Sequence, residues 1–131
     1  MADYNGGSIT KLRANDGSNL GTFPAGSVPY KVAFDGANIW VTNQGSQSVT
    51  KLGSDGTNLG TFAVGGNPIG LAFDGSNIWV ANSASNSITK LRASDGVNLG
   101  TFATGSGPFG VLFDGANIWV TNVFSNNLNR Y

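Results

Sequence analysis

Short apolar runs alternate with polar turns along the whole chain. The turns carry the tetrad Asp-Gly-x-Asn, which begins at Asp16, Asp35, Asp55, Asp74, Asp95 and Asp114. Each tetrad lies between two short runs rich in Val, Ile, Thr, Leu, Phe or Trp. Asp and Gly accept the backbone angles of a tight turn that other residues resist, so each tetrad predicts a β-hairpin.

The hairpins belong to a longer sequence repeat. The stretch from Phe34 to Trp40 returns as residues 73–79 and as residues 113–119, so the tryptophans lie 39 and 40 residues apart. Two tetrads fall in each repeat, which predicts two hairpins, or four strands, per repeat. In the middle repeat the expected strands are residues 69–73, 77–82, 87–91 and 98–102.

The expected strands differ in their apolar pattern. Residues 78–80 are consecutively apolar, which predicts a strand covered on both faces, whereas residues 87–91 alternate as in a half-exposed outer strand. A lysine recurs in the second pattern, at Lys11, Lys51 and Lys90, where we expect it to be solvated and to discourage strand addition. Four antiparallel strands that are buried inside and wet outside are typical of one β-propeller blade.

The repeat resembles that of a known group of propellers. It reads Pro-x-Gly-Val/Leu-x-Phe-Asp-Gly-x-Asn-Ile-Trp-Val-x-Asn, followed by Ser-x-Ser-Val/Ile-Thr-Lys-Leu, and covers essentially the whole chain. It is similar to the blade repeat of the NHL-type and virginiamycin B lyase-like propellers. This resemblance implies an all-β propeller of four-stranded blades of about 40 residues. A lyase of that kind would be expected to use His and Glu, and this chain has neither, so the resemblance stops at the fold.

Composition narrows the function classes. Seven basic and seven acidic residues leave no net charge, so no nucleic-acid footprint or polybasic membrane patch is present. All seven acids are Asp, six of them precede a Gly, and Cys and His are absent. We therefore expect no enzyme, no catalytic residue, no metal site and no cofactor. Calcium bound by Asp and Asn oxygens of the turns is the alternative that we weigh against this expectation.

The chain shows no targeting signal. Residues 1–6 lack the basic and apolar segments of a signal peptide, and no apolar run is long enough to span a bilayer. We expect a soluble chain whose cellular compartment is unknown.

Counting strands shows that one chain holds too few blades for a ring. Thirteen strands are expected, equivalent to three blades and one extra strand. We divide the single repeat domain into a partial blade (1–27), a blade (28–66), a second blade (67–106) and a partial blade (107–131). Closed propellers have about four to eight blades, and an open fan would expose two apolar blade faces.

The expected partner is therefore a second copy of the chain, joined head to tail. A homodimer with six blades is favoured, and a trimer with nine blades is the alternative. In the joining blade, two strands from the C-terminus of one chain would meet residues 8–12 and 18–23 of the next chain. Residues 125–131 would then be surplus, because they have lost the Thr-Lys of the repeat.

The end of the ring opposite the tetrad turns is the top face, where propellers normally bind ligands. The hypothetical ligand-binding residues there are Tyr30, Asn43, Asn82, Phe109, Asn122 and Phe124. Amides and aromatic faces suit a sugar, whereas the simpler interpretation is that the Asn side chains cap loop backbone. The tryptophans are expected to pack between blades rather than to form a stacking platform.

Two functions from different classes follow. The first is a self-assembling propeller scaffold without enzymatic activity, whose ring is closed by strand sharing between subunits. The alternative is a multivalent top-face module that binds a carbohydrate or peptide. A fragment of a longer propeller or an engineered protein would show the same sequence features.

Overall fold

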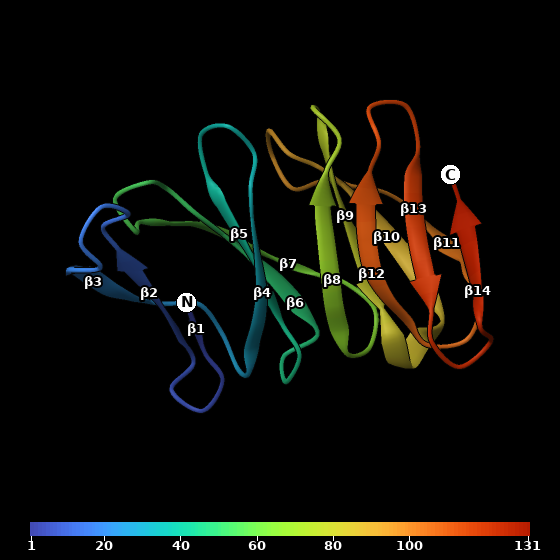
Figure 1. Cartoon of the computed structure of the whole chain (residues 1–131), viewed down its shortest axis with the longest axis horizontal. Helices are drawn as coiled ribbons and strands as arrows, with labels where there is room; N and C mark the ends of the chain where they lie inside the picture. Colours follow the sequence, from blue (N-terminus) through green and yellow to red (C-terminus); the bar gives the residue numbers. More distant parts are fainter.

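The computed structural model describes residues 1–131 and contains fourteen strands in four antiparallel sheets (Figure 1). The first sheet holds β1 (Ala2–Asp3), β2 (Ser8–Leu12) and β3 (Asn19–Pro24), and the second holds β4 (Pro29–Phe34), β5 (Ile39–Asn43), β6 (Ser48–Leu52) and β7 (Asn58–Ala63). The third holds β8 (Pro68–Phe73), β9 (Asn77–Asn82), β10 (Ser87–Arg92) and β11 (Asn98–Ala103). The fourth holds β12 (Pro108–Phe113), β13 (Ile118–Asn122) and β14 (Asn127–Arg130).

Strands that follow one another in the sequence are neighbours in their sheet, so every sheet is a meander of hairpins. This arrangement confirms the predicted all-β fold of four-stranded repeats. The one helical element is the 3₁₀ turn η1 (Ser83–Ser85), and the chain has no helix with the length and apolarity needed to cross a membrane.

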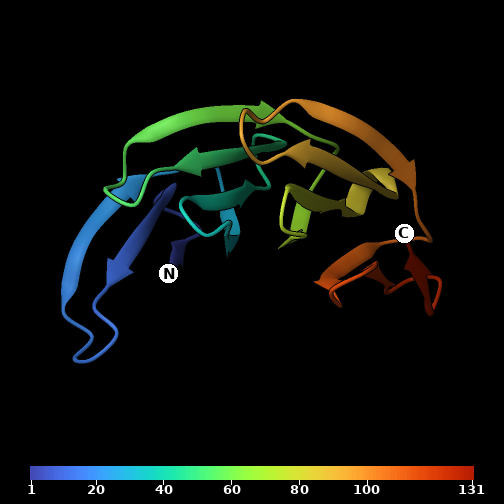
Figure 2. The same ribbon diagram turned by 90° about the horizontal axis from the view of Figure 1, so that it is seen from above.

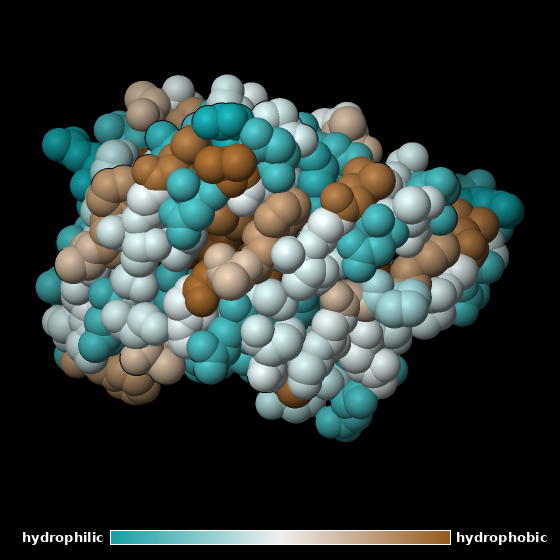
Figure 3. Space-filling view, turned by 180° about the vertical axis from the view of Figure 1, so that it is seen from behind, coloured by the Kyte–Doolittle hydropathy of each residue, from teal (hydrophilic) through white to brown (hydrophobic).

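The four sheets stand side by side along an open arc (Figure 2). The strands β4, β8 and β12 lie on the concave side, and β3, β7 and β11 form the convex side. On the face seen from behind, hydrophobic residues form separate patches among hydrophilic residues (Figure 3). The two ends of the arc do not meet, so one chain forms part of a propeller rather than a closed ring.

The first sheet contains a strand that the sequence pattern did not predict. In β1, Ala2 and Asp3 pair with Ile9 and Ser8 of β2, and the amino terminus donates a hydrogen bond to Thr10 O at 2.8 Å. The short strand covers an edge of β2 that would otherwise expose its backbone groups. Its two residues carry no Ile-Trp-Val pattern, so the sequence offers no signal for it, and the expected total of thirteen strands is one too low.

Each pair of neighbouring sheets is joined by its own apolar cluster. Trp40 of the second sheet is fully buried against the third sheet, and Trp79 of the third sheet packs against the fourth. The cluster between the first and second sheets has no tryptophan and consists of Ile9, Ala25, Val41 and Leu52. The tryptophans therefore pack between blades, as the sequence predicted.

The third strand of each complete blade is more buried than its alternating pattern suggested. Every residue of β6 is buried, and Lys51 is only 7% exposed. Its Nζ donates hydrogen bonds to Ala93 O at 2.7 Å and Ser94 O at 3.1 Å in the next sheet, and it lies 5.3 Å from the ring centroid of Trp40. The expectation that this lysine is solvated is wrong, because its ammonium group links two sheets. The wet strands are instead β7 and β11.

The turn between β10 and β11 lies in close contact with the second sheet. Gly96 has φ +77°, and a Cβ at this position would lie 2.1 Å from the Phe62 ring of the second sheet, whereas Gly75, with φ +99°, has open space around it. We expect Gly75→Ala to cost about 1 kcal/mol from backbone strain and Gly96→Ala about 3 kcal/mol, because the ring must also move. Urea denaturation of both variants measures the difference, and equal losses would contradict the packing described.

Candidate functional site

Three of the Asp-Gly-x-Asn turns hold the tryptophan side chains. The Asp35 carboxylate accepts hydrogen bonds from two backbone N–H groups of its own turn and from Trp40 Nε1 at 2.7 Å. The same indole bond joins Asp74 to Trp79 at 2.7 Å and Asp114 to Trp119 at 2.6 Å. Turn and tryptophan thus form one unit, and the carboxylate is already engaged rather than free to act as a general base.

These hydrogen bonds favour the ionised carboxylate. Partial burial acts to raise the pKa of Asp35 and Asp74, but the bonds from the indole and the turn backbone outweigh it, so both pKa values lie below the usual one for Asp. At the exposed Asp114, the bond from Trp119 is the main cause that holds the pKa of the carboxyl far below its usual range.

The other three tetrad turns, at Asp16, Asp55 and Asp95, join the third and fourth strands of each blade. The backbone N–H group two residues after Asp16, and the one two residues after Asp55, each donate a hydrogen bond to the carboxylate. These bonds lower the pKa of both Asp side chains. Arg13 and Arg92 pair with Asp16 and Asp95 at 3.3 and 2.9 Å. Nowhere in the chain do three or more Asp side chains come together in a way that could hold a metal ion.

The three asparagines proposed for the top face are buried at the ends of β5, β9 and β13. Asn43 Nδ2 donates to Thr50 Oγ1 at 2.9 Å, and Asn82 Nδ2 donates to Thr89 Oγ1 at 2.9 Å. Asn122 makes the corresponding bond, at 2.8 Å, to an asparagine of β14. These amides link neighbouring strands, so they are not open to a ligand as the top-face hypothesis expected.

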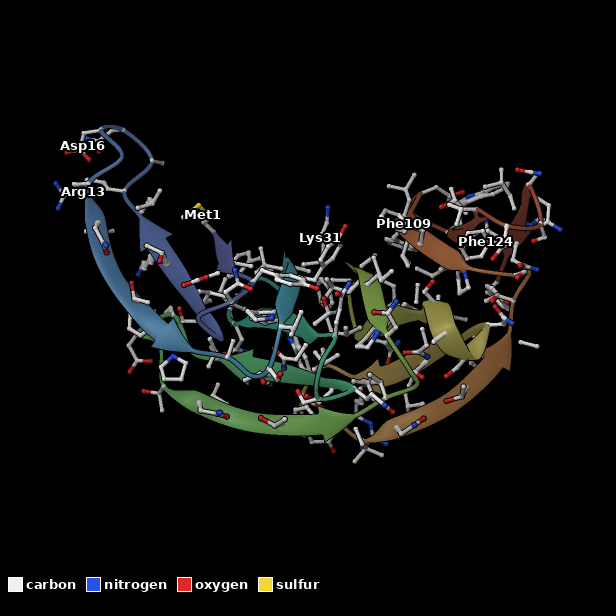
Figure 4. The ribbon with its side chains drawn as sticks, turned by 90° about the horizontal axis from the view of Figure 1, so that it is seen from below. Met1, Arg13, Asp16, Lys31, Phe109 and Phe124 are labelled. Carbon is white, nitrogen blue, oxygen red and sulfur yellow. The ribbon has the colours of Figure 1, made fainter.

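Of the predicted top-face residues, Tyr30 and Phe109 are the pair that the fold brings together. Their rings meet edge to face with centroids 6.4 Å apart, beside a cavity of about 170 Å³ that Lys31 also lines. Lys31 lies on the concave side of the arc and makes no ion pair (Figure 4). Phe124 is exposed in the loop before β14 and packs over Gly107.

An apolar cavity of about 320 Å³ lies between the first and second sheets. It is lined by Met1, Ile9, Phe23, Val32, Phe34, Ile39 and Leu52, among other residues. Val32 is 43% and Phe34 57% exposed. Sequence reasoning did not identify this site. Its signal was the absence of any tryptophan-bearing strand before β4, although the receiving positions of the repeat are present there.

The free side of the fourth sheet is the second exposed apolar surface. Leu112 is 63% and Leu128 59% exposed, and with Trp119 they line an open hollow. Val49 and Ile88 occupy the position of Leu128 in the two complete blades, and both are fully buried. The two ends of the arc therefore expose positions that the interior of the arc buries.

No protein-family model matches this sequence, and no curated protein matches it significantly. Solved structures match its fold over nearly the whole chain. Virginiamycin B lyase from Staphylococcus aureus, in a catalytically inactive form with quinupristin, superposes with a TM-score of 0.81 and 19% identity, covering 98% of this chain and 46% of that one. Hydrazine synthase from Kuenenia stuttgartiensis gives 0.78 and 21%, covering 97% and 43%.

A computationally designed protein, Ika4, superposes with a TM-score of 0.81 and 14% identity, covering 98% of this chain and 80% of that one. The chain spans less than half the length of the natural proteins named above. At these identities the likeness shows the fold alone. It confirms a β-propeller that resembles the virginiamycin B lyase-like group.

The lowered pKa values predict how the stability of the fold depends on pH. A depressed folded-state pKa of Asp adds stability above the unfolded value of about 3.9, and this stability is lost as the pH falls below it. With no His or Glu in the chain, the free energy of unfolding should stay flat between about pH 5 and 6.5 and then drop below about pH 4. Urea denaturation at each pH, monitored by tryptophan fluorescence, measures this free energy of unfolding. A decrease in the free energy of unfolding already at pH 6 would contradict the prediction.

Proposed function

We propose that the chain is a self-assembling β-propeller scaffold without enzymatic activity, closed head to tail by a second copy of itself. The observation that carries this proposal is that the first and fourth sheets are both incomplete, and that each has the strands that the other lacks. The first sheet has third and fourth strands, β2 and β3, but only two residues in the position of the second strand. The fourth sheet has first and second strands, β12 and β13, and lacks a fourth.

Joined together, β12 and β13 of one copy and β2 and β3 of the next would complete one blade. Two copies then form six blades, within the range of about four to eight that closes a ring. Such strand sharing requires β2 of the second copy to replace β14 beside β13. The sequence of β2 suits this place, because Thr10 and Lys11 keep the Thr-Lys of the complete blades, where β14 has Asn129 and Arg130.

The repeated lysine contact supports the same junction. Lys11 donates a hydrogen bond to Ser54 O at 3.0 Å in the next sheet, and Lys51 donates to the corresponding turn of the third sheet. Lys90 has the ring of Trp79 at 4.9 Å but no turn beyond it, because the fourth sheet ends at β14. In the proposed ring, the turn between β2 and β3 of the second copy would supply the missing carbonyl groups.

A scaffold role also agrees with the chemical inventory of the chain. It has no His, Cys or Glu, and the three Asp residues beside tryptophans are committed to hydrogen bonds and have lowered pKa values. None of these carboxylates is suited to accept a proton near neutral pH.

The solution mass tests the assembly. Light scattering at micromolar concentration should give about 27 kDa, twice the 13.5 kDa of one chain. A variant that lacks residues 125–131 should still form a dimer, with twice the mass of the shortened chain, because β14 is the strand that the assembly displaces. Removal of residues 1–23 should abolish assembly. A stable single chain would refute the proposal, three copies would indicate the nine-bladed ring, and the reverse deletion result would show that β14, not β2, completes the blade.

The Tyr30 and Phe109 pair favours a second candidate function, a top-face module that binds a carbohydrate or peptide. Aromatic faces and the unpaired Lys31 border the same cavity, and a ring of two copies would present it twice. Binding to a glycan panel that is lost in Tyr30→Ala and Phe109→Ala, but kept in the control Leu59→Ala on the convex strand β7, would support this function. Absence of binding to any glycan or peptide would leave the scaffold alone.

A further inference from the structure

We infer that the 320 Å³ cavity between the first and second sheets is a socket for an indole ring, and that Trp119 of a second copy fills it. The inference rests on the proposed head-to-tail assembly and names the side chain that closes the ring. It commits to one occupant because the same junction already exists twice inside the chain, and the socket continues that series.

The junction between the second and third sheets shows what belongs in such a socket. There Trp40 is fully buried in one cluster with Leu71, Ile78 and Leu91 of the receiving sheet. The next junction follows the same rule, since Trp79 packs against Ile118 and Val120 of the fourth sheet. Trp40 and Trp79 thus each pack against the sheet that follows their own.

The walls of the empty socket correspond position by position to the walls around Trp40. On the receiving sheet, Val32, Ile39 and Leu52 take the places of Leu71, Ile78 and Leu91. On the donating side, Ile9 and Phe23 take the places of Val49 and Phe62. The tryptophan has no counterpart, because β1 stands where the tryptophan-bearing strand of a complete blade would run.

Trp119 is the tryptophan that lacks a receiving sheet. It lines an open hollow with Leu112 and Leu128, both largely exposed. Its indole N–H already donates to Asp114 at 2.6 Å, just as that of the buried Trp40 donates to Asp35 at 2.7 Å. The ring can therefore enter an apolar socket without leaving a polar atom unpaired.

The socket also determines how the strands must be shared. For Trp119 to reach Val32 and Ile39 of a second copy, β13 must take the place of β1 beside β2. Two copies could also meet without this exchange, each keeping its four sheets. Trp119 of one copy would then face the first sheet of the other, and the socket between the first and second sheets would stay empty. Filling the socket thus selects strand sharing with three blades per chain, which gives six blades when two copies close the ring.

A second contact has the same two open halves. Phe23 lies over Gly56 and Phe62 over Gly96, each in the turn of the following sheet. At the end of the series Phe102 is 40% exposed, while Gly17 at the start has nothing within 4 Å of an added Cβ. In the six-bladed ring Phe102 would cover Gly17 of the second copy.

The test uses one variant on each side of the junction. Trp119→Ala removes the occupant, and Val32→Arg places a charge in the socket at a position already exposed in the single chain. Each should raise the dissociation constant of the dimer about 100-fold, because two sockets are lost per ring. Leu59→Arg, at an exposed leucine on the convex side, should leave it unchanged.

Mixing the two variants separates a specific contact from general damage. A mixed dimer has one junction with both Trp119 and Val32 intact, so it should form about 10-fold more tightly than either variant alone. Gly17→Ala should weaken assembly at least about 10-fold, whereas Gly75→Ala, which has the same open space and a positive φ, should not. Dilution of the wild-type dimer should shift its tryptophan emission to the red, and this shift should be absent without Trp119.

The outcomes distinguish the socket from the assembly itself. If the wild-type chain dimerises and Trp119→Ala, Val32→Arg and Gly17→Ala dimerise equally well, the ring closes in another way and the socket is overturned. If mixing fails to restore dimers of correctly folded variants, the direct contact is overturned. If the wild-type chain stays single at micromolar concentration, the proposed assembly fails, and the socket with it.

Discussion

The structure depends on the hydrogen bond between a turn aspartate and a tryptophan five residues later. The same carboxylate accepts hydrogen bonds from backbone N–H groups of its own turn, and the indole bond satisfies the one polar atom of the tryptophan ring. The ring can then lie fully inside an apolar cluster, as Trp40 does. Because that cluster is made with the following sheet, a local turn and a contact between blades become one unit. Repetition of this unit sets the sheets in their order along the arc.

Much of the fold could be predicted from the sequence because its signals are local. Each Asp-Gly-x-Asn tetrad specifies a turn by itself, and the spacing of the tetrads specifies strand length and the meander. The packing role of the tryptophans follows from their apolar neighbours. What could not be predicted depends on contacts between blades. Lys51 looks like an exposed lysine in an alternating strand, and only the turn of the next sheet gives its ammonium group a buried partner.

The candidate site shows the same limit. Tyr30 and Phe109 were singled out because they differ between repeats, and the fold brings their rings into contact. Asn43 looks like a loop residue, yet it is buried because Thr50 of the neighbouring strand accepts its amide hydrogen bond. The cavity at the first sheet escaped sequence reasoning because it arises from an absence. Its walls are ordinary repeat positions, and they become a site only where the preceding strand is missing.

The likeness to solved propellers is shown for the backbone fold. One chain differs from a closed propeller in the open ends of its arc.

The junctions along the arc repeat corresponding contacts, apart from the tryptophan that the first one lacks, so small displacements of the sheets add rather than cancel. If each sheet were displaced slightly along the axis relative to the one before it, identical junctions would generate a spiral, and copies would add without end as a filament. Closure of the proposed ring would therefore require the sheets to stay level as well as to follow a curve. The contacts of Phe23 with Gly56 and of Phe62 with Gly96 bear on such a displacement, because each joins a strand of one sheet to a turn of the next.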